Sequence, residues 1–120
     1  MVGESEGTGS VNSYYWNRED DSTHACDMLD PRTVRVDNDA WRVAKDMVGL
    51  FLVSTVFLGI DHNFYGDGPP LLFETMVFHD NLVDLFCDRY STAAAARIGH
   101  ASVVEQLRAG KTPNQIVRAA

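Results

Sequence analysis

The sequence lacks several features that would assign it to a functional class. It contains two cysteines, Cys26 and Cys87, and neither belongs to a C-x-x-C pair, which argues against the common zinc and thiol redox motifs. Seventeen acidic residues outnumber ten basic ones, so the chain lacks the excess of positive charge that binding to nucleic acid phosphates requires. No P-loop, G-x-S-x-G, H-E-x-x-H or G-x-G-x-x-G motif occurs. We therefore assign no catalytic residue and expect no metal, no cofactor and no nucleic acid partner.

Long apolar runs are also missing. The longest mainly apolar stretch covers residues 50–60 and stops at Asp61, which is well short of the ~20 residues of a membrane-spanning helix. Residues 1–10 have neither the basic start nor the apolar segment of a signal peptide. We therefore expect a cytoplasmic protein that has reduced thiols and does not associate with a membrane.

The negative charge is concentrated near the N-terminus. Residues 1–40 carry nine acidic and three basic side chains, whereas residues 41–120 carry eight and seven. Residues 1–30 are rich in Gly, Ser, Asp and Glu and have little hydrophobic periodicity, which predicts an acidic, largely disordered tail that is dispensable for folding. Residues 14–16, Tyr-Tyr-Trp, are the part of this tail that could dock on the domain or on a partner. Residues 31–120 then form a single domain.

Alternating patterns in this domain predict an antiparallel sheet. A β-branched segment at 33–36 is a candidate edge strand, and alternation resumes from Trp41 towards a turn at 46–49. Residues 50–60 are apolar on both faces, which predicts a central strand. Two further strands are predicted at 71–78 and 82–90, with a turn at 79–81 between them.

The periodicity changes after residue 90. Ser91 or Thr92 is a suitable N-cap, and the four alanines at 93–96 strongly favour a helix. Gly110 is placed to end this helix. The stripe expected to cover the sheet, with Leu107 beside it, consists of Ala94, Ile98, Ala101, Val104 and Arg108.

A short second helix is predicted from Thr112-Pro113 to about residue 118. The predicted fold class is therefore α+β: an antiparallel β-meander of three to five strands packed against one C-terminal helix, with a disordered acidic N-terminal tail.

One end of the predicted sheet gathers polar side chains. The loop after the central strand begins there with Asp61-His62, the third meander strand returns to it, and the helix starts there. The N–H groups of a helix start attract anions, and a carboxylate beside an imidazole can orient it as a base. An alternative gives Asp61 and Ser91 capping roles and lets His62 pack on Phe64 or Tyr65. The candidate binding residues are Asp61, His62, Asp67, Arg89, Tyr90 and Ser91.

Other ionisable residues favour structural roles. If 50–60 pairs with 71–78 so that Val53 lies near Phe78, His62 and His79 lie about 25 Å apart at ~3.3 Å per residue and cannot share a metal ion. Glu74 interrupts an apolar strand and must be either exposed or paired, because burial of an unpaired carboxylate is unfavourable. Its candidate partners are Arg89 and Arg42.

Three blocks of sequence carry a family resemblance: VSTVFLGIDHNF at 53–64, GDGPPLLFETMVF at 66–78 and DRYST at 88–92, followed by Gly99-His100. In these blocks the chain resembles a family of small, uncharacterised bacteriophage and prophage proteins, particularly of actinobacteria. The resemblance covers about residues 41–107 and implies a phage or prophage origin and a host-cell setting, but no mechanism. The chain departs from the family pattern at 79–81, where a glycine-rich turn is usual, and at 93–96, where alanines replace the usual Trp and Glu.

Two hypotheses for function follow. The first is a phage or prophage accessory protein without enzymatic activity, which binds an unknown host or phage macromolecule in the host cytoplasm. The second is a small ligand-binding module or enzyme that uses the Asp61-His62 loop and the helix start after Ser91. A concave pocket beside His62 would favour the second hypothesis, and a flat or convex surface there would favour the first.

Overall fold

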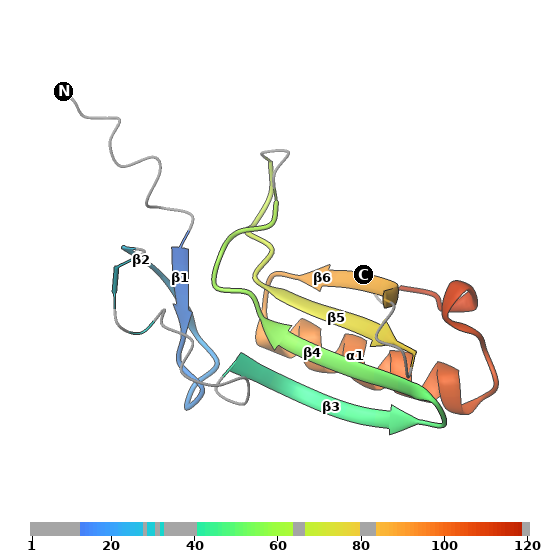
Figure 1. The fold of residues 1–120 in the computed structure, drawn as a ribbon. Helices are drawn as coiled ribbons and strands as arrows, with labels where there is room; N and C mark the ends of the chain where they lie inside the picture. The colour runs from blue at the N-terminus through green and yellow to red at the C-terminus, as the bar shows by residue number, and fades with distance from the viewer. Residues whose placement is uncertain are drawn as a thin grey trace.

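The computed structural model describes residues 13–27, 29–30, 32, 41–63, 67–79 and 84–118. Figure 1 shows a four-stranded sheet with a helix along one side and a two-stranded hairpin beside one end. In chain order the elements are β1 (Ser13–Trp16), β2 (Thr23–Cys26), β3 (Arg42–Val48), β4 (Phe51–Phe57), β5 (Phe73–Phe78), β6 (Asp84–Tyr90), α1 (Ala93–Arg108) and the 3-10 turn η4 (Pro113–Gln115).

The larger sheet is an antiparallel meander in the order β3-β4-β5-β6, and α1 covers one of its faces (Figure 1). This arrangement confirms the predicted α+β fold class. The register differs from the prediction by one residue, because Val53 lies opposite Val77 and not Phe78. Side chains alternate between the two faces of a strand. The observed register therefore puts Val53 and Val77 on the same face, where both are fully buried.

The helix-side face of the sheet holds two apolar clusters with a polar band between them. The first cluster consists of Val53, Val77, Phe86, Val103, Val104, Leu107 and Ile116. The second consists of Phe57, Leu72, Phe73, Tyr90, Ala93 and Ala96. The polar side chains between them are also buried, and they are Thr55, Thr75 and His100.

The opposite face is called here the open sheet face. No described helix or strand lies over it in Figure 1. Its described side chains follow from the alternation along each strand and from the strand registers: Arg42, Lys45 and Met47 of β3, Leu52, Ser54 and Val56 of β4, Glu74, Met76 and Phe78 of β5, and Leu85, Cys87 and Arg89 of β6.

The helix presents a different face to the sheet from the predicted one. Ile98, expected at the core, is 66% exposed. Gly99 faces the sheet instead, where a Cβ atom at this position would overlap the Tyr90 ring. The helix thus contacts Tyr90 through Gly99, which has no hydrophobic side chain, and this contact sets which face of the helix meets the sheet. The buried helix residues are Ala93, Ala96, Gly99, His100, Val103, Val104 and Leu107.

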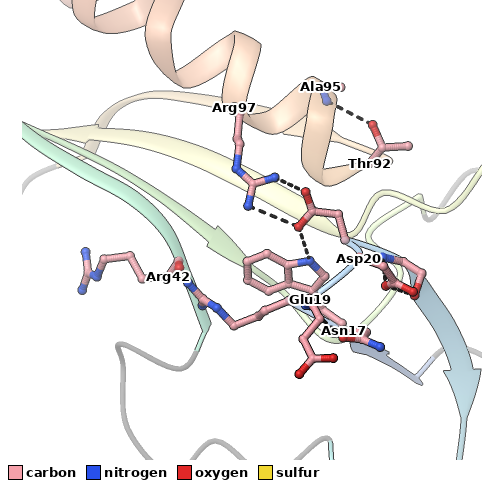
Figure 2. A network of polar contacts seen from close by, with 11 residues as sticks. Asn17, Glu19, Asp20, Arg42, Thr92, Ala95 and Arg97 are labelled. Atoms are coloured by element: carbon pink, nitrogen blue, oxygen red, sulfur yellow. Dashed lines mark hydrogen bonds and ion pairs between the residues drawn. The ribbon is translucent and has the colours of Figure 1, made fainter.

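The predicted ends of the helix are confirmed. The Thr92 side chain accepts a hydrogen bond from the Ala95 N–H at 3.1 Å (Figure 2). Gly110 has a φ of +99°, a left-handed conformation that glycine adopts without strain, and the helix ends before it. The second helix is shorter than predicted, because η4 stops at Gln115 and Ile116 is already extended.

The N-terminal segment also differs from its prediction. Residues 1–12 lie outside the described residues, but β1 and β2 form an antiparallel hairpin within the segment expected to be largely disordered. The Trp16 ring packs on Phe57 and Phe73, with ring centroids 5.9 Å and 5.5 Å away. The Tyr14 N–H donates to the Gly59 carbonyl at 2.9 Å. The hairpin therefore extends the second apolar cluster beyond the helix.

An ion pair links this hairpin to the helix. Arg97 of α1 pairs with Asp21 in the turn between β1 and β2, and Figure 2 shows the Arg97 side chain directed from the helix to this turn. Asp21 also accepts a hydrogen bond from the Trp16 indole at 3.3 Å. The hydrogen bond from Arg97 holds the pKa of the Asp21 carboxyl below its ordinary value. The same carboxylate thus orients the tryptophan and connects the hairpin to α1.

Several predicted features lie outside the described residues. They are the edge strand at 33–36, most of the turn at 79–81, and Phe64 and Tyr65 as possible packing partners of His62. The turn predicted at 46–49 begins later, because β3 continues to Val48 and Gly49 takes a φ of +59°.

Replacement of Trp16 by alanine tests whether the hairpin belongs to the folded domain. A fully buried tryptophan contributes ~3–5 kcal/mol, so for the half-buried Trp16 we expect Trp16→Ala to lower the free energy of unfolding by about 2–3 kcal/mol. Tyr15→Ala is the matched control, because the Tyr15 ring contacts His24 and Arg32 and not the two apolar clusters. Equal effects of the two substitutions in urea denaturation would show that the hairpin does not stabilise the sheet.

Candidate functional site

The structure places Asp61 and His62 together in the loop that leaves β4. Asp61 Oδ1 accepts hydrogen bonds from the backbone N–H groups of Asn63 (2.7 Å) and Leu71 (2.9 Å). A carboxylate in this position closes the loop at both ends, because it satisfies one donor just after itself and another at the start of the returning chain. Asp61 therefore has the capping role that was predicted from the sequence as the alternative to a catalytic role.

The neighbouring imidazole has a structural contact as well. His62 Nδ1 lies 2.8 Å from the Ile60 carbonyl oxygen. Since a carbonyl oxygen only accepts, Nδ1 carries the proton in this bond. The backbone N–H of His62 donates to Leu71 O at 2.9 Å, which continues the connection between the two sides of the loop. Both predicted candidates therefore contribute hydrogen bonds that shape the loop.

The side chains of the remaining predicted residues do not converge with those of Asp61 and His62. Asp67 is exposed, and its backbone carbonyl accepts a hydrogen bond from the Asn63 side chain at 2.7 Å. Arg89 lies on the open sheet face, whereas Tyr90, the next residue, is buried on the helix side. Ser91 precedes the residue that caps the helix. The six side chains thus share one end of the sheet without forming one site.

Glu74 has the structural partner that its burial requires. Its Oε2 atom lies 2.9 Å from Arg89 Nε, and the Cys87 thiol donates to the same oxygen at 3.3 Å. The Glu74 side chain is 12% exposed and that of Arg89 is 39% exposed. The expected structural ion pair is confirmed, and Arg89 is the partner.

Tyr90 has a structural role in the contact between the sheet and the helix. Its phenol oxygen is buried and meets no hydrogen-bond partner. Burial raises the pKa of the Tyr90 phenol above its ordinary value, and the nearby Thr75 opposes this shift without reaching hydrogen-bonding geometry. The ring packs beneath Gly99, so Tyr90 serves the contact between sheet and helix.

A chain of hydrogen-bonded polar side chains that crosses the core involves residues that were not predicted as a site. His100 of α1 places Nε2 at 2.7 Å from Asp46 Oδ2 and Nδ1 at 2.8 Å from Thr55 Oγ1. Thr55 Oγ1 lies 2.5 Å from Thr75 Oγ1. Side chains from β3, α1, β4 and β5 therefore form one chain of hydrogen bonds through the interior.

The direction of these hydrogen bonds follows from the carboxylate at the outer end. An ionised Asp46 only accepts, so His100 Nε2 donates to it, and in the neutral imidazole Nδ1 then accepts from the Thr55 hydroxyl. The Thr55 oxygen in turn accepts from Thr75. Each polar atom along the chain has a partner in this arrangement, which is the condition for burying it without a large energetic cost.

A carboxylate, an imidazole and a hydroxyl in series are also the components of nucleophilic catalysis. Here the hydroxyl is inaccessible, because Thr55 and Thr75 are both 0% exposed and His100 is 5% exposed. A substrate carbonyl or phosphoryl group could not approach the Thr55 oxygen without disrupting the core. The chain of hydrogen bonds therefore connects elements of the fold and does not constitute an active site.

Two cavities lie away from the predicted site. One, of about 510 Å³, adjoins the exposed end of the hydrogen-bond chain and is lined by Asp46, His100, Ala101, Val104, Glu105 and Arg108. The other, of about 370 Å³, lies between the β3–β4 turn and the end of α1, with Phe51, His79 and Leu107 in its wall. Neither cavity is lined by residues of the 61–70 loop, so neither offers a pocket beside His62.

Comparison with known proteins adds no assignment, because the chain matches no protein-family model, no curated protein and no solved structure. Within the part of the chain that the structure describes, no three His, Cys, Asp or Glu side chains are grouped to hold a metal ion. The same part contains no helix of the length and apolarity needed to span a membrane. The geometry of the molecule is therefore the basis for proposing a function.

Two histidine substitutions distinguish the buried chain from the loop. We expect His100→Ala to lower the free energy of unfolding by about 2–4 kcal/mol, because it leaves a cavity and removes the acceptor of a buried hydroxyl. We expect His62→Ala to lower it by about 1 kcal/mol or less, because His62 lies in a loop. Chemical denaturation of both variants checks this order, and an effect of His62→Ala as large as that of His100→Ala would contradict it.

Proposed function

We propose that this chain is a non-enzymatic interaction protein that binds another macromolecule through the open sheet face. The observation that carries the proposal is the apolar character of this face, over which no described helix or strand lies. A solvated face of an antiparallel sheet is usually lined with polar residues. Here Leu52, Val56, Met76 and Phe78 occupy four of the six outward positions of the two central strands, and Ser54 and Glu74 occupy the other two.

The exposure of the face supports the same function. Met47 is 59% exposed and Leu85 is 40% exposed, at opposite edges of the sheet, with the partly exposed Leu52, Met76 and Phe78 between them. Exposed apolar side chains that are contiguous, as opposed to scattered, mark surfaces that another molecule covers. A flat sheet face suits a macromolecule better than a small ligand, which needs a concave site.

The alternative, a small ligand-binding module or enzyme at the Asp61-His62 loop and the helix start, has less support. Asp61 and His62 both make hydrogen bonds that hold the loop. Thr92 caps the helix start with its own side chain. A phage or prophage accessory role in the host cytoplasm is part of our proposal and rests on the sequence resemblance alone.

The test compares capture of a partner by three forms of the protein. One is the natural chain, one carries Met47→Asp with Leu85→Asp on the open sheet face, and the control carries Ile98→Asp on the exposed side of α1. Each is immobilised, exposed to host lysate and analysed by quantitative mass spectrometry, after thermal melting has shown that all three are folded.

We expect at least one protein to be retained by the natural chain and by the Ile98→Asp control and to be depleted at least tenfold with the double variant. Retention that is equal for all three forms would show that binding does not use this face. Retention of no partner by any form would contradict the proposed function itself.

A further inference from the structure

We infer, on the basis of the proposed function, that the open sheet face binds an acidic, partly apolar polypeptide segment of its partner. The first observation is the sign of the charge on this face. The chain as a whole carries a net charge of −7. Among the described side chains of the open sheet face, however, Arg42, Lys45 and Arg89 are cationic and Glu74 is the one carboxylate.

The charged and apolar side chains occupy different parts of the face. The strand registers place Met47, Leu52 and Phe78 in one row across β3, β4 and β5. Two residues along each strand, or ~7 Å away, the next row contains Lys45, Ser54, Met76 and Cys87. A further two residues along β4, β5 and β6, and three along β3 because of a bulge, lies the row Arg42, Val56, Glu74 and Arg89. Among the described side chains, the face therefore changes from apolar at one end to charged at the other, where two arginines outnumber one carboxylate.

Two cationic groups are placed to receive carboxylates. Lys45 is exposed on the edge strand β3. Arg89, at the opposite edge, uses Nε for its hydrogen bond to Glu74, and its side chain is 39% exposed. A guanidinium has further N–H donors that bind a carboxylate with two parallel hydrogen bonds. A partner segment with acidic residues at this end and apolar residues over Met47 and Phe78 would match both properties of the face.

A nucleic acid fits these observations less well. Sequence-independent binding of single strands uses several aromatic platforms and a continuous cationic groove, whereas Phe78 is the one aromatic side chain among those described on this face. A long polyanion would also extend beyond the face and experience the repulsion of the remaining negative charge. A short acidic segment stays within about 10 Å of Lys45 and Arg89, the distance over which charges act at 0.1 M salt.

A second copy of the chain is also a poorer match. Two copies stacked face to face would place Lys45 and Arg89 of one against either the same cations or the apolar row of the other. Like charges repel in the first arrangement, and the cations lose hydration without a partner in the second. Carboxylates from a different polypeptide avoid both costs.

Binding of synthetic peptides tests this chemistry directly. The probe is a fluorescein-labelled octapeptide of alternating glutamate and leucine. Three comparison probes are the same peptide with lysine for glutamate, the same peptide with serine for leucine, and a single-stranded DNA oligonucleotide. Fluorescence anisotropy at 0.1 M salt measures the affinity of the full chain for each. We expect the glutamate–leucine peptide to bind at least tenfold more tightly than each of the other three.

Matched variants locate the binding surface. Lys45→Glu should weaken binding of the glutamate–leucine peptide at least tenfold, whereas Arg108→Glu, an equal charge reversal at an exposed position of α1, should change it less than twofold. Met47→Ser should weaken binding severalfold, whereas Ile98→Ser on the helix should not. Lys45, Met47, Arg108 and Ile98 are all exposed, so these substitutions should leave the fold intact.

Four results would overturn the inference: equal or tighter binding of the lysine peptide, equal or tighter binding of the DNA, no binding of the glutamate–leucine peptide, or a dimer in sedimentation that Met47→Ser dissociates and that excludes the peptide. If lysate capture depends on the open sheet face but the acidic peptide does not bind, the inferred partner chemistry is wrong and the proposed function stands. If the peptide binds but no form captures a partner from lysate, the proposed function fails and the affinity of the face for acidic segments stands.

Discussion

The two hydrogen bonds of His100 determine how this domain is assembled. One reaches Asp46 on β3 and the other reaches Thr55 on β4, from which the chain continues to Thr75 on β5. Because the His100, Thr55 and Thr75 side chains are buried between two apolar clusters, any other rotation or shift of α1 would leave hydroxyls and an imidazole without partners. Unsatisfied buried groups each cost about 1–3 kcal/mol, so a single arrangement of helix and sheet is favoured over its alternatives.

The surface available to a partner follows from this arrangement. With His100 directed at the sheet, the helix occupies one face, and Trp16 of the hairpin covers the end of the same face. The helix and the hairpin thus cover the same face of the sheet. The apolar residues of β4 and β5 on the open sheet face have no described element above them. The groups at the Asp61-His62 loop, in contrast, are held in hydrogen bonds of the loop itself. The open sheet face, and not the Asp61-His62 loop, is therefore the surface that we propose for binding.

Local patterns predict the elements of this fold, and contacts between distant residues explain what those patterns miss. Alternation identifies the meander, and Ser91 or Thr92 together with Gly110 marks the ends of the helix. The burial cost of Glu74 predicts exposure or a pair with Arg89 or Arg42, and the structure contains the pair with Arg89. The rotation of α1 is not predictable from its own residues, because Ile98 is more hydrophobic than Gly99 and His100 and is nevertheless exposed. The hairpin is missed because strands of four residues show too little periodicity. Thr55 and Thr75, polar residues at inward positions of apolar strands, are the sequence feature that could have indicated a buried partner such as His100.

The protonation pattern of His100 tests most directly whether this buried chain organises the domain. A long-range ¹H–¹⁵N correlation spectrum of the folded protein distinguishes a ring nitrogen that carries a proton from one that accepts a hydrogen bond. We predict that the His100 ring occupies a single hydrogen-bonded form, with a proton fixed on Nε2 facing Asp46. Two tautomers in rapid exchange, as in an imidazole exposed to water, would contradict the central role of this residue.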